Sequence, residues 1–158
     1  MTRDDRGFTI RDDDLGGAQT QDLLRLHLRE AHANSPPGSV FALDLSGLKR
    51  PDISVWTAWQ GARIAGIGAL KIHPAQRGEL KSMRTHPDFL RRGVAAMLLG
   101  HIVAQARARG LVRLSLETGS GPAFEPALAL YRAHGFADGE AFADYPQTAF
   151  NRFLHLPL

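Results

Sequence analysis

Two arginines and a glycine, Arg91, Arg92 and Gly93, stand where an apolar strand passes into a long apolar helix, in the stretch LKSMRTHPDFLRRGVAAMLLG. The first turn of a helix leaves backbone N–H groups without partners and carries a partial positive charge. A glycine there lets an anion approach the backbone closely. The three residues are therefore a candidate phosphate site. Two arginines before a helix are by themselves more often solvated, so the elements around them decide the interpretation.

Cysteine and histidine usage narrows the chemistry that the chain can carry out. The sequence contains no cysteine, which excludes disulfides, thiolate nucleophiles and cysteine metal sites. His27 and His32 are five residues apart, which places them on different sides of a helix, a spacing that does not suit paired metal ligands. We therefore expect no metal.

The first half of the chain predicts a strand, a helix, a long loop and three further strands. FTIRDDDL alternates like a strand, and TQDLLRLHLREAHAN predicts a helix with Thr20 as its N-cap. SPPGSVFALDLSGLKRP holds three prolines and predicts a long loop with one short helix in FALDLSGL. ISVWTAW and ARIAGIGALKIH, joined by the turn QG, predict an antiparallel hairpin, and ELKSMRTH predicts the next strand.

The second half of the chain alternates helices and strands around the candidate site. A helix over residues 93–109 ends at Gly110, and the strand VRLSLET follows it. After the loop GSGPAF, the helix EPALALYRAH ends at Gly135, and a last strand pair lies near FADY and in AFNRFLHL. The expected order is β-α-β-β-β-α-β-α-β-β.

Length, composition and charge indicate one domain over residues 1–158. With 158 residues and 44% apolar content, the chain is long enough for one core and too short for two ordinary domains. It has no apolar run that would span a membrane, and its first residues are charged where a signal peptide needs apolar ones, so we expect a cytoplasmic protein without a membrane partner. The net charge of +3 is scattered, which suits a phosphorylated small ligand better than nucleic acid.

Two runs resemble the GCN5-related N-acetyltransferase (GNAT) superfamily. LRRGVA, residues 90–95, resembles its pyrophosphate loop, with the pattern Gln/Arg-x-x-Gly-x-Gly/Ala, and ALYRAHGF resembles its next helix. The longer run LSLETGSGPAFEPALALYRAHGF is similar to bacterial YsnE-like acetyltransferases, whose substrate is unassigned. This chain departs from the pattern at Leu90, where relatives carry Gln or Arg, and at Thr118 and Gly119, where many carry an Asn.

The resemblance implies an α/β (α+β) fold with acetyl-CoA as co-substrate. We expect a mixed, mostly antiparallel sheet flanked by helices, with the family's fourth and fifth strands splayed at the cofactor site. Backbone groups of the fourth strand would follow the pantetheine arm, and one N–H would face the thioester oxygen. The cofactor-binding residues that the resemblance implies are Met83, Arg84, Thr85, Arg91, Arg92, Gly93, Val94, Ala95, Ala96 and Phe124.

The resemblance also implies an acid and a base. Tyr131 occupies the place of the tyrosine that donates a proton to the leaving thiolate, a role compatible with packing in the core. Glu79 stands where the namesake enzymes carry a glutamate base, although a solvated residue or a partner of Lys81 is an equally weighted interpretation. Glu117 is the reserve base, and water is a third choice. Asp144 is either a contact for a cationic amine or a surface carboxylate.

The sequence thus predicts an acetyl-CoA-dependent N-acetyltransferase that moves an acetyl group to a primary amine of a small molecule by direct attack on the thioester. The alternatives are a protein or peptide N-acetyltransferase and a non-catalytic acyl-CoA-binding sensor. The acceptor's identity is left open because its specificity would lie in the loop over residues 34–52 and in the last strands, which carry no motif. A homodimer is also left open.

Overall fold

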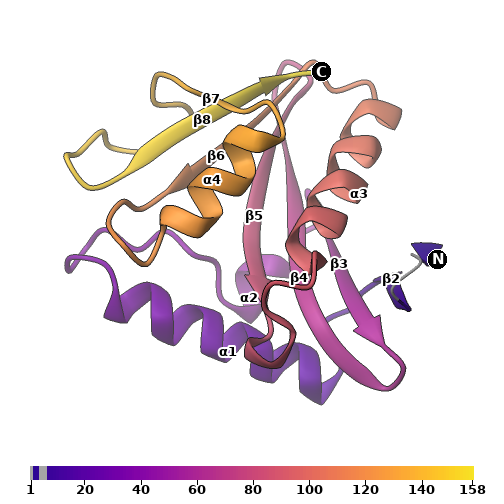
Figure 1. The fold of residues 1–158 in the computed structure, drawn as a ribbon. Coiled ribbons are helices and arrows are strands. Elements are labelled where there is room, and N and C mark those ends of the chain that lie inside the picture. The colour runs from indigo at the N-terminus through magenta and orange to yellow at the C-terminus, as the bar shows by residue number, and fades with distance from the viewer. Residues whose placement is uncertain (1, 4–6) are drawn as a thin grey trace.

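The computed structural model describes residues 2–3 and 7–158 as a mixed eight-stranded sheet with helices on both faces (Figure 1). Within those residues, no helix has the length and apolar content to cross a bilayer. The strands are β1 (Thr2–Arg3), β2 (Phe8–Asp12), β3 (Ile53–Gln60), β4 (Arg63–His73), β5 (Arg77–Thr85), β6 (Arg113–Thr118), β7 (Ala137–Asp138) and β8 (Arg152–Pro157). The helices are α1 (Ala18–Ala33), α2 (Leu45–Leu48), the 3-10 turn η1 (Pro87–Phe89), α3 (Val94–Ala108) and α4 (Glu125–Ala133).

The sheet is antiparallel except at one junction. Its strand order is β1-β2-β3-β4-β5-β6-β8-β7, and every neighbouring pair is antiparallel apart from β5 and β6, which are parallel. The parallel connection requires a crossover, and α3 supplies it. The expected mixed, mostly antiparallel fold is confirmed. The strand numbers of the family, four and five, correspond to β5 and β6 here, because the short β1 adds one strand at the start.

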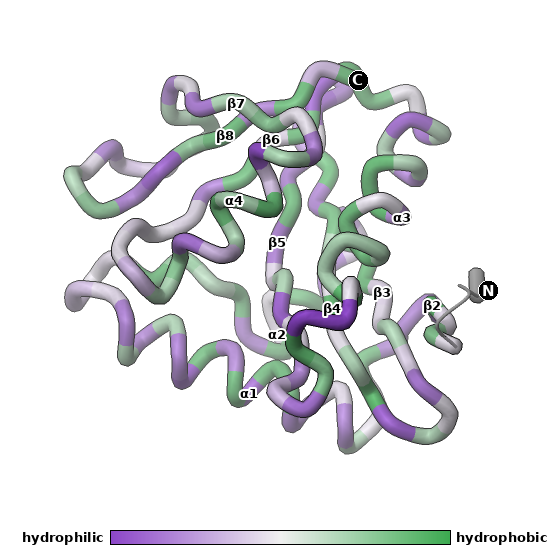
Figure 2. Tube along the Cα trace, viewed as in Figure 1, coloured by the Kyte–Doolittle hydropathy of each residue, from purple (hydrophilic) through white to green (hydrophobic). Residues whose placement is uncertain are grey.

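Each face of the sheet has its own apolar core. One core joins α3 and α4 to side chains such as Leu80, Leu114 and Leu116, and the other joins α1 and α2 to Ile67 and its neighbours. Figure 2 shows the contrast at α3, where a strongly hydrophilic segment leads into a mostly hydrophobic helix. The apolar side chains of α3 hold it against the sheet by burial, which is the main stabilising contribution in a domain of this size.

Two glycines of β4 allow α3 to lie close to the sheet. A Cβ added at Gly66 would come within 2.7 Å of Val94 Cγ1, and one at Gly68 would come within 2.8 Å of Ile102 Cδ1. Real Cβ atoms do not approach so closely, so larger residues would push the helix away. The two glycines therefore set the distance between α3 and β4.

Two local predictions are wrong. Helix α1 starts at Ala18 with Gly17 as N-cap, and the Thr20 hydroxyl instead donates to Asp13 Oδ2 at 2.9 Å. The second concerns FADY, residues 142–145, which form a turn rather than a strand, while β7 lies earlier at Ala137–Asp138. The turn, with Ala143 at a φ of 51°, brings the rings of Phe142 and Tyr145 against Phe153, which an extended strand would direct to opposite sides.

Candidate functional site

β5 and β6 pair over a short stretch and then part. Their parallel register runs through Arg77↔Arg113, Gly78↔Leu114 and Glu79↔Ser115. Beyond it, among the described residues, β5 pairs with β4 alone and β6 pairs with β8 alone. Figure 1 shows the two strands diverging from the end where they meet. The predicted splay is confirmed. We call the part of the sheet beyond Glu79↔Ser115, where β5 and β6 are no longer paired with each other, the opening.

The loop before α3 has the backbone form of an anion cradle. Gly93, the N-cap of α3, lies in the left-handed region at φ 81° and ψ 11°, and no side chain caps the helix. Arg91 also has a positive φ of 60°, an uncommon conformation for a non-glycine residue. Since the first intrahelical bond runs from Met97 N–H to Gly93 C=O, the N–H groups of Val94, Ala95 and Ala96 have no acceptor within the helix. These amides fit a pyrophosphate.

The side chains of this loop suit an anion less well than its backbone amides do. Leu90 is 59% exposed and has no polar group to offer. The Arg92 guanidinium lies over the rings of Phe8 and Phe89, with its Cζ 5.2 and 5.3 Å from their centroids. Arg91 is exposed. Contacts from Arg91 and Arg92 to phosphate therefore stay a prediction, and the backbone amides carry the fit.

A bulge in β5 breaks the strand pairing beside the opening. The register with β4 shifts between Ala69↔Lys81 and Ile67↔Arg84, and Ser82 lies at a φ of 57°. The Ser82 hydroxyl oxygen is buried and has no hydrogen-bond partner among the described residues. A bulge leaves the extra residue outside the hydrogen-bond ladder. The bulge lies beside Met83, where the resemblance places the pantetheine arm and the thioester, and contacts of this backbone with acetyl-CoA stay a prediction.

Arg84 fixes the end of β5 to α1. Its Nε donates to His27 Nδ1 at 3.0 Å, and its Nη1 donates to Glu30 Oε2 at 2.9 Å. Burial, together with the positive charge of Arg84, lowers the pKa of His27 to about 4. His27 is therefore neutral at physiological pH and can accept from the guanidinium. The Arg84 side chain is a link between elements, while its backbone stays the predicted contact for the cofactor.

Tyr131 lies in the core on the α3/α4 face. Its side chain is 7% exposed, and its ring centroid is 5.9 Å from that of Phe136. Burial raises the pKa of its phenol to about 12, and the positive charge of Arg84 acts in the opposite direction. The packing interpretation is confirmed. The phenol keeps its proton at neutral pH and can donate it only to a base whose proton affinity is raised by the same burial.

Glu79 is the centre of a buried polar network on the α1/α2 face. Its carboxylate is 2% exposed, accepts from Lys81 Nζ at 3.2 Å, and lies 2.8 Å from His73 Nε2. The Tyr145 hydroxyl donates to the same Glu79 oxygen as Lys81, and Lys81 Nζ also contacts Tyr145 Oη at 2.7 Å. The pairing of Glu79 with Lys81 is therefore present. Both carboxylate oxygens are occupied, which favours a supporting role over proton abstraction.

Glu117 has the properties of a general base. It follows Ser115 by two residues on β6, just past the last paired position, and it is half-buried. Burial raises its pKa to about 7, Lys81 and a hydrogen bond with Asn151 act to lower it, and Glu79 acts to raise it. A carboxyl group that titrates near neutral pH is poised to accept a proton.

Aromatic side chains from two distant segments cover the α1/α2 side of the opening. Phe41, from the long loop after α1, packs edge-on against Tyr145 at 5.3 Å between ring centroids. Phe142 packs against Tyr145 at 5.3 Å and against Phe153 of β8 at 5.8 Å. We call Phe41, Phe142 and Tyr145 the aromatic cover. It joins the loop after α1 to the loop before β8 across the face where Glu79 and Lys81 lie.

The structure thus brings together residues that were predicted separately and adds several that were not. Glu79 and Glu117 lie on the same side of the sheet, whereas Tyr131 lies on the other. Asp144, weighed as an amine contact, is exposed, and its neighbour Tyr145 points inward instead. Phe124 is the N-cap of α4 and packs against Phe150 at 5.6 Å, so its contact with the cofactor stays a prediction. The resemblance placed the segment FADYP, which holds Tyr145, beside the acceptor site, but no sequence signal marked Phe41 or the packing of the three rings.

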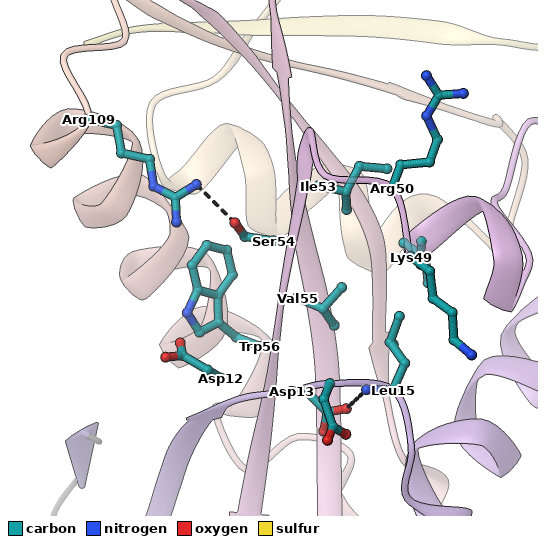
Figure 3. Close-up of a pocket in the computed structure, with 12 residues that line it drawn as sticks. Asp12, Asp13, Leu15, Lys49, Arg50, Ile53, Ser54, Val55, Trp56 and Arg109 are labelled. Atoms are coloured by element: carbon teal, nitrogen blue, oxygen red, sulfur yellow. Dashed lines mark hydrogen bonds between the residues drawn. The ribbon is translucent and has the colours of Figure 1, made fainter.

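A hollow of about 400 Å³ lies elsewhere, between the end of β2, the start of β3 and the end of α3 (Figure 3). Arg109 crosses it to donate to Ser54 at 2.9 Å and lies 5.5 Å over the ring of Trp56. Asp13 beside it accepts from Leu15 N–H, Thr20 and Thr57. These groups bond to one another, and none of the residues predicted for catalysis or cofactor binding lines the hollow. We interpret the hollow as the place where β2, β3 and the end of α3 pack together, and not as a ligand site.

Sequence comparisons place these features in a family context. The profile of the Acetyltransferase (GNAT) family matches residues 20–136. The chain is 49% identical over 151 residues to the uncharacterized N-acetyltransferase YedL of Escherichia coli, covering 96% of this chain and 95% of that protein. It is 48% identical over 145 residues to the uncharacterized N-acetyltransferase YsnE of Bacillus subtilis, covering 92% and 96%.

Solved structures share the fold. A Klebsiella pneumoniae protein, provisionally assigned as an acyl-CoA N-acyltransferase, superposes with a TM-score of 0.80 at 27% identity and covers 96% of this chain and 97% of its own. A Bacillus subtilis acetyltransferase in complex with CoA superposes with a TM-score of 0.72 at 20% identity, covering 96% and 99%. At 20% identity the second likeness speaks for the fold alone.

Proposed function

Because this chain belongs to the acetyltransferase (GNAT) family, we propose that it transfers the acetyl group of acetyl-CoA to a primary amine of a small molecule. The observation that carries the proposal is the arrangement around the splay of β5 and β6. Tyr131 lies on one face of the sheet, Glu117 points to the other, and the strands part between them. An acid and a base on opposite sides of an opening suit a reaction in which the nucleophile arrives from one face and the leaving group departs on the other.

Acetyl-CoA supplies the thioester whose carbonyl carbon the amine attacks directly. The amides at the start of α3 would hold its pyrophosphate, and the bulged backbone of β5 would hold the arm and the carbonyl oxygen. Both are backbone groups, fixed by the packing of α3 on Gly66 and Gly68. They need no side-chain reorganisation when a ligand arrives.

Glu117 is the base that the contacts favour. The acceptor's ammonium must lose a proton before nitrogen can attack, and a carboxylate of pKa about 7 is ionised in half of the molecules at that pH. As the C–N bond forms and the C–S bond breaks, Tyr131 would give its phenolic proton to the departing sulfur. Glu79 remains the alternative base. Replacing Glu79 and Glu117 one at a time distinguishes which of the two carboxylates accepts the proton.

The aromatic cover favours a small acceptor. The contact between Phe41 and Tyr145 joins the loop after α1 to the loop before β8 on the face where Glu79 and Glu117 lie. A compact amine would need less separation of these rings than an extended polypeptide. A protein or peptide acceptor would require the two rings to part.

Thiol release from acetyl-CoA in the presence of separate panels of small amines and short peptides tests the proposal. We expect release that depends on a small primary amine, and we expect Tyr131→Phe to slow it roughly 10²-fold while acetyl-CoA affinity is nearly kept. The variant keeps the ring and its packing against Phe136. Peptide-dependent release would replace the small-molecule acceptor, and acetyl-CoA binding with no release for any amine would indicate a sensor. Equal rates for Tyr131→Phe and wild type would leave Tyr131 as a packing residue.

A further inference from the structure

Lys81 carries a buried charge whose cost needs a reason. Its side chain is 8% exposed, and its ammonium contacts Glu79 Oε2 at 3.2 Å and Tyr145 Oη at 2.7 Å. The nitrogen also lies 5.4 Å from the centroid of the Tyr145 ring. Burying an ion pair costs desolvation that the pair often does not recover, and apolar residues frequently serve stability as well. A lysine at this buried position therefore suggests a role beyond the stability of the fold.

The register of the strands places this ammonium opposite Glu117. Glu79↔Ser115 is the last paired position of β5 and β6, and Lys81 and Glu117 each follow it by two residues on their own strand. Side chains two residues apart share a face, and Leu80, Leu114 and Leu116 point to the other core. Lys81 and Glu117 therefore face each other on the α1/α2 side, where the strands begin to part.

Charged and polar groups of β4, β5, β8 and the loop before β8 lie on the same face of the sheet as Glu117. From β4 come Lys71 and His73, the latter bound to Glu79, and from β5 come Glu79 and Lys81. From β8 comes His155, which lies 2.7 Å from Ser115 Oγ. From the loop before β8 come Tyr145 and Asn151. Among these groups, Lys81 is the cation that Glu79 and Tyr145 hold in place at the opening.

We propose that Lys81 is a positioning residue for the reaction: Glu79 and Tyr145 hold its ammonium opposite Glu117, where it keeps that carboxylate ready to accept the acceptor's proton. The inference rests on the proposed function. Tyr145 belongs to the aromatic cover, so the same side chain fixes the lysine and covers the acceptor face. The plain alternative is a structural ion pair between Lys81 and Glu79 that has no effect on Glu117.

Two charge changes of opposite sign separate the two interpretations. Lys81→Met removes a positive charge that favours ionised Glu117, so the apparent pKa of Glu117 should rise by roughly half to one pH unit. Glu79→Gln removes a negative charge that disfavours ionisation, so the apparent pKa should fall by a similar amount. Damage to the fold at either position has no reason to give opposite signs. Lys81→Arg keeps the charge and should leave the pKa in place, and Tyr145→Phe, which changes no charge, should move it less than either variant.

The pKa of Glu117 is read in two independent ways. Carbon-13 NMR of the carboxyl groups, with the Glu117 signal identified by its loss in Glu117→Gln, follows the titration without any substrate. The acidic limb of kcat/KM follows it during turnover, and thermal melts confirm that each variant is folded. Should Lys81→Met fail to fold, Glu79→Gln still gives a signed shift.

Each outcome bears on one proposal at a time. Shifts of opposite sign in the NMR titration support the electrostatic coupling of Lys81 to Glu117 even where no amine is acetylated, in which case the proposed function fails alone. An unmoved Glu117 titration in Lys81→Met, or shifts of the same sign in both variants, overturns the positioning role and leaves Lys81 as half of a structural ion pair. Acetyl transfer that persists in that case leaves the proposed function intact.

Discussion

The loop before α3 and the polar network around Glu79 are built in different ways. The loop is one continuous stretch whose working groups are backbone amides, placed by a left-handed Gly93 at the start of a helix. The network draws side chains from β4, β5 and the loop before β8, and its members are up to 72 residues apart in the sequence, from His73 to Tyr145. The same molecule thus forms its two half-sites by local and by long-range means.

The two regions differ in how much change of sequence they can accept. Backbone amides present the same groups whatever the side chains are, so we expect the loop to bind an anion with Leu90 in place of Gln or Arg. The network instead depends on the identity of each side chain, because removing one partner leaves a buried charge or donor without its match. Binding of a shared co-substrate suits the first kind of site. Recognition of a particular acceptor suits the second.

The largest expected effect comes from Glu117, the carboxylate on β6 beside the network. Glu117→Gln should lower turnover by roughly 10² to 10⁴ and remove the acidic limb of the pH profile, which in wild type should fall below about pH 7 as the base takes up a proton. Steady-state kinetics between about pH 5.5 and about pH 9 measures both the turnover and the position of the acidic limb. Acetyl-CoA affinity should stay close to wild type because the loop is untouched.

Glu125→Gln is the matched control, since Glu125 is an exposed glutamate at the start of α4. It should behave as wild type. If Glu79→Gln instead loses the acidic limb and Glu117→Gln keeps it, the base is Glu79, and the network rather than β6 holds the reacting group.

A smaller effect breaks the loop side. Gly93→Val places a β-branched side chain at a φ of 81° and beside the amides of α3, so acetyl-CoA binding should weaken roughly ten- to a hundredfold. Calorimetric titration measures the affinity. The acidic limb of kcat/KM should stay where it is, because no charge near Glu117 changes.

Gly100→Ala serves as the control for this variant. Gly100 lies within the same helix, and a Cβ there meets no atom within 4 Å. That variant should bind acetyl-CoA as wild type does. Unchanged affinity in a folded Gly93→Val protein would remove the loop from the cofactor site.

The smallest expected effect of Glu117 is on the free energy of unfolding. The pKa of Glu117 is raised from 4.5 to about 7 by burial, so the native state binds more protons than the unfolded chain between those values. The free energy of unfolding should therefore fall as pH rises through this window, and the penalty should be full above it. Glu117→Gln removes the penalty, so the variant should be more stable than wild type at pH 8 by roughly 1 to 2 kcal/mol, since solvent screens part of the charge at this half-buried site.

His27 complicates the raw curve but not the difference. Its lowered pKa of about 4 gives stability that is present above about pH 6.5 and lost as pH falls. Because both proteins contain His27, subtracting their urea unfolding curves at each pH cancels it. If the difference in the free energy of unfolding between Glu117→Gln and wild type is the same at about pH 4.5 and at about pH 8, it contradicts the raised pKa of Glu117.

Much of the fold could be predicted from residue patterns, and the errors have physical causes. The β3–β4 hairpin, the helices α3 and α4 and the glycines that end them were marked by alternation, helical spacing and turn chemistry. Thr20 was misplaced because its hydroxyl donates to Asp13, which lies outside the helix and whose same carboxylate oxygen also accepts from Thr57. FADY was misassigned because ring packing on Phe153 prevailed over strand propensity.

The backbone conformation of the proposed cofactor loop could be predicted from residue types alone. A glycine with a positive φ before an amphipathic helix is a local requirement, so the run LRRGVA already carries it, and the tyrosine of ALYRAHGF is placed by helical spacing from Leu128. The difference between the two candidate bases could be seen only in the folded chain. Glu79 and Glu117 look alike as residues, and they differ because His73, Lys81 and Tyr145 occupy the first while burial beside the splay leaves the second to titrate near neutral pH. Burial and charge at a point depend on every element that meets there, and no local pattern encodes that sum.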